Sequence, residues 1–223
     1  MRRGARSGRS RSVPASLALL LAGSLLGGCG LLGKPQPLSA DAPLTMSVTS
    51  PDFIGNVIPP QFTCHGAGES PPIFWSGAPA GTKSLALVID DSAAPISPKV
   101  YWIVFDIGTD TTDLQANAAG GTGPKAARTQ LPPHARTAYN SAGTATYDPP
   151  CPKGSWHNYR FTIYALNTFF GSRLPAHPQL LQAWTTIAQH VIARGTLTAR
   201  ALPTAAAPTN SLRSGNPAAR TGR

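Results

Sequence analysis

The sequence is poor in charged residues. Only 13% of its 223 residues are charged, against roughly 25% in an ordinary globular protein, while 41% are apolar. The 22 glycines and 23 prolines together stay below the share, roughly 25–30%, at which composition alone argues for disorder. These shortages exclude the collagen, coiled-coil and acidic disordered classes. The length predicts one folded domain with appendages.

Acidic residues are the scarcest charged type, and the resulting charge of +10 first suggests a nucleic-acid partner. The excess, however, lies at the two ends, with five arginines before residue 12 and four more cations at 34, 213, 220 and 223. Between residues 41 and 200, ten basic residues meet nine acidic ones. Nucleic-acid binding needs several cations on one folded face, so this composition argues against it.

The N-terminus has the pattern of a secretory signal peptide. After the arginines, residues 13–26 are dominated by Leu and Ala, a stretch too short for a membrane span of about 20 residues. It ends in Leu26-Gly27-Gly28-Cys29, which resembles a bacterial lipobox. We therefore expect residues 1–28 to be a signal peptide and Cys29 to carry acyl chains that anchor the protein outside the cytoplasmic membrane. An ordinary signal peptide with an incidental Cys29 is the alternative.

The other two cysteines, Cys64 and Cys151, form an even pair in an oxidising compartment, which favours a disulfide. This bond would close a loop of 87 residues, for which the chain-entropy model gives a stabilisation on the order of 4 kcal/mol. The alternative is that one of the two is a catalytic thiol beside His65 or His157.

The central region predicts a mainly β domain with one late helix. Residues 84–90 and 100–107 are nearly continuous apolar runs typical of strands covered on both faces, and residues 159–167 alternate in polarity. Residues 44–49 and 195–201 are weaker strand candidates. The segments 58–79 and 120–154 are rich in Pro and Gly and predict long loops, since proline cannot continue a ladder.

Residues 178–194 predict an amphipathic helix, with apolar side chains at 180, 184, 187, 188 and 191 on one stripe. Pro178 near its start and Gly195 just past its end agree with this. We therefore expect a spacer at 29–42, the domain at 43–201, and a disordered tail at 202–223, where large apolar residues almost disappear.

Three segments of this domain, in register, carry a resemblance to a known family. They are 58–66 (IPPQFTCHG) with 70–72 (SPP), 85–95 (LALVIDDSAAP) with Tyr101 and Trp102, and 148–152 (DPPCP) with 157–161 (HNYRF). Together they resemble the bacterial branch of the phosphatidylethanolamine-binding proteins, over about residues 44–200. The resemblance implies antiparallel sheets packed on each other as in a β-sandwich, a small anion pocket at one end and the C-terminal helix alongside.

The resemblance also implies a set of ligand-binding residues. They are Asp91, Pro95, Tyr101, His157 and Tyr159. Several positions depart from the family pattern: Ser92 replaces a proline, Ala93 an aspartate, Tyr101 a histidine, Asn158 an arginine and Pro149 a glycine. Because a histidine and a backbone N–H are lost, we expect weak anion binding that strengthens below about pH 6.5, where free histidine becomes charged.

The sequence thus predicts a membrane-anchored binding protein for a small anionic or zwitterionic ligand of the phospholipid head-group kind. The alternative is a protein-interaction module, similar to kinase or protease inhibitors, that acts through surface loops such as 120–143. No Gly-x-Ser-x-Gly turn is present, so we do not expect an enzyme. We expect no cofactor and no metal, because the remaining histidines lack metal-ligand spacing; they are His65, His134, His177 and His190.

Overall fold

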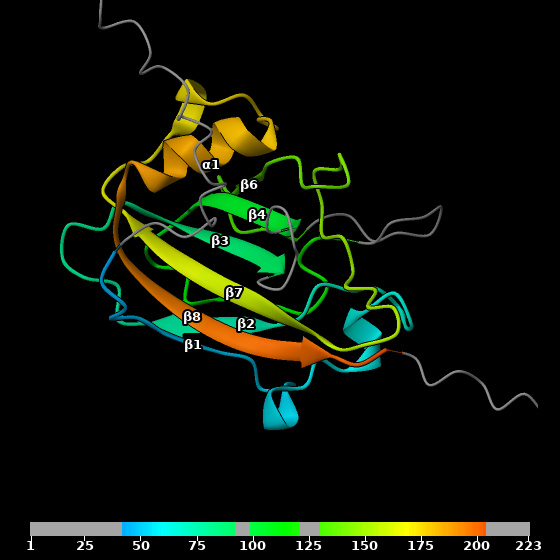
Figure 1. Ribbon diagram of the computed structural model, residues 1–223. Helices are drawn as coiled ribbons and strands as arrows, with labels where there is room; N and C mark the ends of the chain where they lie inside the picture. Colours follow the sequence, from blue (N-terminus) through cyan, green and yellow to red (C-terminus); the bar gives the residue numbers. More distant parts are fainter. Residues whose placement is uncertain (1–41, 92–98, 121–129, 204–223) are drawn as a thin grey trace, which may run out of the picture. The chain divides into compact units, whose positions relative to one another are not determined.

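The computed structural model describes residues 42–91, 99–120 and 130–203 (Figure 1). The expected signal peptide, Cys29, most of the spacer and nearly all of the C-terminal tail lie outside these residues, as does Pro95. The described part is mainly β, with two antiparallel sheets and one short C-terminal helix, as the sequence predicts. None of the helices in these ranges has the length and apolarity needed to cross a membrane.

The larger sheet has five strands in the order β6-β4-β3-β7-β8, all antiparallel to their neighbours. Its central strands are the apolar and alternating runs that the sequence predicts. The bounds are β3 Ser84–Asp91, β4 Lys99–Ile107, β6 Arg136–Thr137, β7 His157–Leu166 and β8 Val191–Ala201. The smaller sheet, in the order β1-β2-β5, comprises β1 Ser47–Thr49, β2 Ile73–Ser76 and β5 Asp113–Leu114.

Both faces of β3 are covered, which explains its unbroken apolar sequence. Leu85, Leu87 and Ile89 pack with residues of the smaller sheet such as Ile73. The alternate residues Ala86 and Val88 pack with Trp184 and Ile187 of the helix. Successive strand side chains point to opposite faces, so a strand between two apolar layers needs apolar residues at every position. Figure 1 shows the helix on one side of the larger sheet, with β1 and β2 on the other.

The helix is shorter than predicted. The helix α1 spans Leu180–Ala188, not 178–194, and β8 already begins at Val191. Val191 lies on the helical stripe, but it pairs with Leu166 across the sheet and packs against the same apolar cluster as Ile187. An apolar residue at this spacing therefore satisfies either structure, and the pairing with β7 decides for a strand.

The two segments predicted as loops contain short strands. In the first, β2 starts directly after Pro71 and Pro72, which leaves both prolines outside the ladder. In the second, β6 is a two-residue edge strand, while residues 121–129 lie outside the described part.

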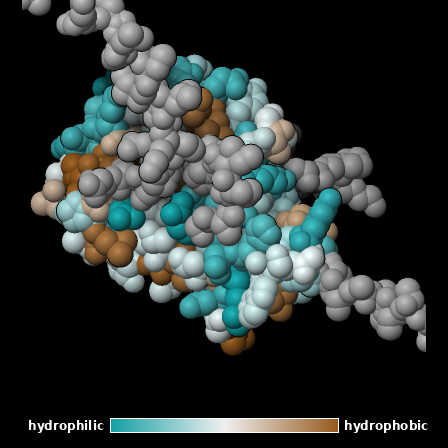
Figure 2. Space-filling view, viewed as in Figure 1, coloured by the Kyte–Doolittle hydropathy of each residue, from teal (hydrophilic) through white to brown (hydrophobic). Residues whose placement is uncertain are grey.

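Three 3₁₀ turns complete the elements of the described residues: η1 Ile54–Asn56, η2 Pro60–Phe62 and η3 Gly171–Arg173. On the visible coloured face in Figure 2, the apolar residues form small separate patches among polar ones.

Candidate functional site

The candidate site forms where β3 ends beside the beginning of β7. Asp91 is the last residue of β3 and lies opposite Tyr159, two residues after His157. Nδ1 of His157 lies 2.8 Å from Oδ2 of Asp91, so the ring donates this hydrogen bond to the buried carboxylate. The bond fixes the tautomer with its proton on Nδ1. The other ring nitrogen, Nε2, therefore carries a lone pair until the ring takes up a second proton.

A β-bulge in β4 brings Tyr101 to the same place. Ile89 pairs with Trp102 but Asp90 pairs with Val100, so Tyr101 is an extra residue in the ladder. Tyr101 and Trp102 consequently both join the cluster between the sheets, although neighbours in a regular strand would point apart. A bulge is a common device for aiming one side chain at a site.

Tyr101 and Tyr159 form a buried hydroxyl pair next to the carboxylate. Their rings meet edge to face at 5.2 Å, and the two side chains share a hydrogen bond. Burial, aided by the negative charge of Asp91, raises the pKa of Tyr159 to about 12. Burial also raises the pKa of Tyr101 far above its ordinary value. Both groups therefore stay protonated at neutral pH and can donate hydrogen bonds. The His157 ring stacks on Tyr159, with 6.5 Å between the centroids.

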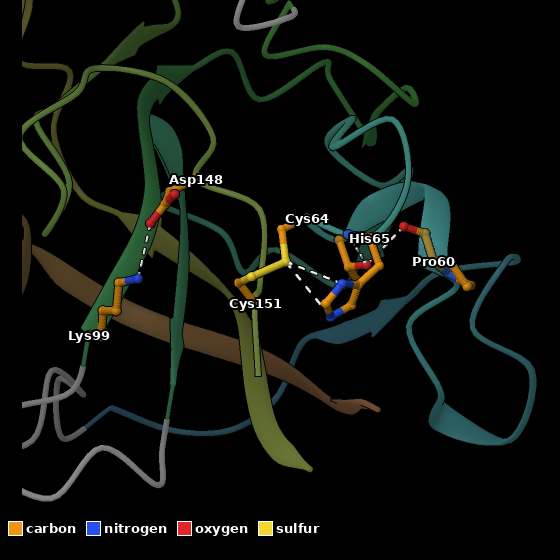
Figure 3. The surroundings of a disulfide bond; sticks show 7 residues. Pro60, Cys64, His65, Lys99, Asp148 and Cys151 are labelled. Carbon is orange, nitrogen blue, oxygen red and sulfur yellow. Dashed lines mark hydrogen bonds and ion pairs between the residues drawn. A yellow bond between two sulfur atoms is a disulfide. The ribbon is translucent and has the colours of Figure 1, made fainter. Parts of the chain in front are cut away.

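Two further charged residues border the site, and the sequence analysis did not name them as ligand-binding. Nζ of Lys99 lies 3.2 Å from Oδ2 of Asp148 (Figure 3). The same nitrogen lies 4.6 Å from the centre of the Tyr101 ring. The backbone N–H of Asp148 donates to the carbonyl of Tyr101, which holds the segment 148–152 against β4. Asp148 belongs to one of the three segments that carry the resemblance, and this membership is the signal that could have identified it.

The predicted disulfide is present. Cys64 and Cys151 are bonded, with their Cα atoms 5.2 Å apart. In this state neither is a thiol, so the structure does not favour the alternative of a cysteine nucleophile. The bond joins two of the segments that resemble the family, 58–66 and 148–152, and Figure 3 shows it beside His65.

The structure brings together Asp91, Tyr101, His157 and Tyr159. Pro95 and Cys29, the other predicted positions, lie outside the described residues. The charged side chains of the site are two carboxylates, one lysine and one histidine that gains charge when protonated. Opposite charges in one small region suit a ligand that itself carries both signs, or an anion once the histidine is protonated.

Comparison with known proteins gives consistent matches. Residues 49–201 match the family model described as phosphatidylethanolamine-binding protein. The chain is 37% identical over 204 residues to a Mycobacterium tuberculosis protein named "Putative lipoprotein LppC", covering 81% of this chain and 90% of that one. It is 42% identical over 111 residues to a UPF0098 protein of Methanothermobacter thermautotrophicus, covering 50% of this chain and 69% of the relative. Among solved structures, Escherichia coli YbcL, described as a member of the mammalian PEBP family, matches with a TM-score of 0.61 and 28% identity, covering 71% of this chain and 98% of that chain.

Proposed function

Because the chain belongs to the phosphatidylethanolamine-binding protein family, we propose that it binds a small anionic or zwitterionic ligand of the phospholipid head-group kind at the Asp91–His157 site. The observation that carries the proposal is the hydrogen bond between Nδ1 of His157 and the buried carboxylate of Asp91. This bond orients the imidazole and leaves Nε2 as the atom that meets the ligand. The two tyrosine hydroxyls beside it share a hydrogen bond, so the pair has one hydroxyl proton left to donate to a ligand.

The protonation state of His157 determines which part of a head group it can contact. With the proton on Nδ1, a neutral ring offers only a lone pair at Nε2, which accepts a hydrogen bond from an ammonium group and repels a phosphate. A second proton turns Nε2 into a charged donor that attracts phosphate. Phosphate affinity therefore rises on acidification. An ammonium contact at this nitrogen weakens over the same range.

Lys99 brings an ammonium group to the site. It is about half exposed and is held near the Tyr101 ring by Asp148. A phosphate that reached Tyr101 would come close to this ammonium, which partly offsets the repulsion from Asp91. Tyr101 replaces a cationic histidine of the family pattern, so Lys99 is the residue that can restore positive charge at this point.

We propose binding rather than catalysis, and attachment of the domain to a membrane through a lipid on Cys29. The two cysteines in the described residues form a disulfide, which removes the most reactive nucleophiles from the site's surroundings. The lipid anchor is supported by the lipobox-like sequence and by the similarity to a relative that is named a lipoprotein. If Cys29→Ser leaves the protein in the membrane fraction, the anchor is wrong.

The binding proposal is tested by NMR of the detergent-solubilised full chain with labelled histidine. Phosphate and phosphoethanolamine are titrated at about pH 6 and about pH 7.5, on either side of the range in which histidine usually titrates. We expect saturable shifts of the His157 ring with both ligands, and tighter phosphate binding at the lower pH. His157→Ala should abolish binding, while His134→Ala, on a loop next to Phe169, should leave it unchanged.

The two ligands distinguish the two ends of the head group. If phosphoethanolamine binds better than phosphate at the higher pH, the ammonium contacts neutral His157. If both bind equally, phosphate alone is recognised. No response at millimolar concentrations of either ligand contradicts the proposal. That result would favour the interaction module that acts through surface loops.

A further inference from the structure

The disulfide has an adjacent imidazole that the head-group site does not use. His65 follows Cys64 in the chain, and its two ring nitrogens lie 3.7 and 3.8 Å from the Cys64 sulfur (Figure 3). One ligand atom from each of Cys64, His65 and Cys151 lies within 4.8 Å of the others, and all three residues are exposed to solvent. Two sulfurs and one imidazole nitrogen are the ligand types that zinc and other soft or borderline cations prefer.

The spacing suits a tetrahedral metal once the disulfide is open. With Zn–S near 2.3 Å and Zn–N near 2.0–2.1 Å, tetrahedral angles place two sulfurs about 3.8 Å apart and sulfur and nitrogen about 3.6 Å apart. The distances from the His65 nitrogens to the Cys64 sulfur already agree with the second value. The two sulfurs must separate, and the ring, whose ligand atom lies within 4.8 Å of both, must adjust toward the Cys151 sulfur; the cysteine Cα atoms, 5.2 Å apart, are close enough to allow this.

Contacts other than the disulfide hold the two cysteines together. The backbone N–H of Cys64 donates to the carbonyl of Pro150 at 3.0 Å, next to Cys151. The buried Tyr147 hydroxyl donates to the carbonyl of Phe62 at 2.8 Å. These hydrogen bonds join the same two segments that the disulfide joins, and they do not depend on the redox state of sulfur.

The turn that carries His65 is also fixed independently of sulfur. The hydroxyl of Thr63 accepts from the backbone N–H of His65 and donates to the carbonyl of Pro60. Gly66 closes the turn so tightly that a Cβ there would lie 2.4 Å from the Pro60 oxygen. The three side chains therefore stay near one another after reduction.

We propose that Cys64, His65 and Cys151 form a redox-gated site for zinc or a similar soft cation. A dithiol reductant transfers two electrons, becoming a disulfide as the Cys64–Cys151 bond is cleaved to two thiols. Zinc then binds two thiolates and one neutral imidazole nitrogen, and the two thiol protons go to solvent. Solvent or an external ligand completes the four-coordinate shell. In the reverse direction a disulfide oxidant accepts two electrons and two protons and becomes two thiols, while the Cys64–Cys151 bond forms again; this removes both thiolates and releases the metal.

The test uses cobalt as a spectroscopic substitute for zinc. The detergent-solubilised full chain, carrying Cys29→Ser to remove the third sulfur, is reduced with dithiothreitol, freed of reductant without oxygen, and titrated with Co²⁺. We expect one equivalent to bind, with the thiolate-to-cobalt absorption of a tetrahedral site. Zinc should displace the cobalt. The oxidised protein should give no such absorption.

Single-residue variants distinguish cobalt binding at this site from adventitious cobalt binding elsewhere on the protein. His65→Ala keeps both cysteines and should weaken cobalt binding at least about tenfold with a changed spectrum, because one ligand is lost. Cys151→Ser should abolish the thiolate band of the three-ligand site, and His134→Ala should leave it unchanged. Near-UV circular dichroism of the reduced protein should remain native. Loss of that signal on reduction, absence of cobalt binding, or equal binding by His65→Ala would each overturn the proposal.

Discussion

Two neighbouring carboxylates at the end of β3 have different partners on the two faces of the sheet. Asp90 meets Arg160, which donates from Nε at 3.0 Å and from a second nitrogen. Asp91 accepts a hydrogen bond from Nδ1 of His157. Both carboxylates are almost fully buried, and both partners come from β7. Alternation along the strands sends the first pair to one face and the second pair to the other.

The partner determines what each carboxylate can do. A guanidinium is charged at every physiological pH and engages both oxygens of Asp90, and these hydrogen bonds raise the pKa of Arg160 further. We call Asp90–Arg160 the closed pair, because the guanidinium engages both carboxylate oxygens. Its role is structural. An imidazole takes up or releases a proton near neutral pH and has a second nitrogen to offer. Adjacent residues of β3 thus form a fixed ion pair on one face of the sheet and a switchable pair on the other.

Breaking the closed pair should have the largest effect. Arg160→Met leaves the Asp90 carboxylate buried without its counter-charge, and we expect the free energy of unfolding to fall by about 2–4 kcal/mol. The lower values allow for the partial exposure of Arg160. Urea unfolding measures the change, and the shifts of His157 with phosphate should remain. The double variant Asp90→Leu, Arg160→Met should recover most of the loss, because no unpaired charge remains. A single variant as stable as the wild type would show that the pair is dispensable.

Breaking the switchable pair should cost less stability but change binding. Asp91→Asn keeps the size of the side chain and removes its charge, so we expect a loss of about 1 kcal/mol in unfolding free energy. The histidine tautomer is then no longer fixed by a carboxylate, and the dependence of phosphate affinity on pH should become flatter. Titration by NMR at two pH values measures this. If Asp91→Asn and Arg160→Met changed ligand binding equally, the assignment of separate roles to the two faces would be wrong.

The sequence predicts the centre of the fold well and its edges less well. The runs in β3 and β4 are apolar because each is covered on two faces, and this requirement is visible in the residues alone. The boundary between α1 and β8 is not, because Val191 suits a helical stripe and a strand equally, and a partner distant in sequence, Leu166, decides. The short strand β2 is missed because its flanking prolines suggest a loop.

The residues of the candidate site also fall into those that the sequence predicts and those that it does not. Asp91, Tyr101, His157 and Tyr159 were predicted as ligand-binding residues through resemblance, and the structure places them next to one another; their role in binding stays a prediction. The pair of Lys99 with Asp148 was not found, since no periodicity relates residues 49 positions apart. The sequence analysis named His65 only as a possible neighbour of a catalytic thiol and did not expect it to be a metal ligand, because the second sulfur of the cluster comes from residue 151.

The smallest predicted effect concerns the buried hydroxyls on the switchable face. The pKa of Tyr159 rises from its ordinary value of 10.0 to about 12. Between these values the unfolded chain loses this proton and the folded chain keeps it, so stability falls as the pH increases through the window. Tyr159→Phe removes one such group and should make the fall less steep, although Tyr101 and Tyr147, whose pKa values are also raised, retain part of it.

Urea unfolding at several pH values from about 8 to about 12 measures this dependence. Below the window, the two curves should run parallel, with the variant lower by about 1 kcal/mol because the hydrogen bond to Tyr101 is lost. Above about pH 10, the two curves should converge. Only the wild type has Tyr159, which loses its proton when the chain unfolds in this range, and this proton loss lowers the stability of the wild type alone. Curves that stay parallel up to about pH 12 would mean that Tyr159 titrates like an exposed tyrosine. The hydroxyl pair would then not be the buried, protonated donor that the head-group site requires.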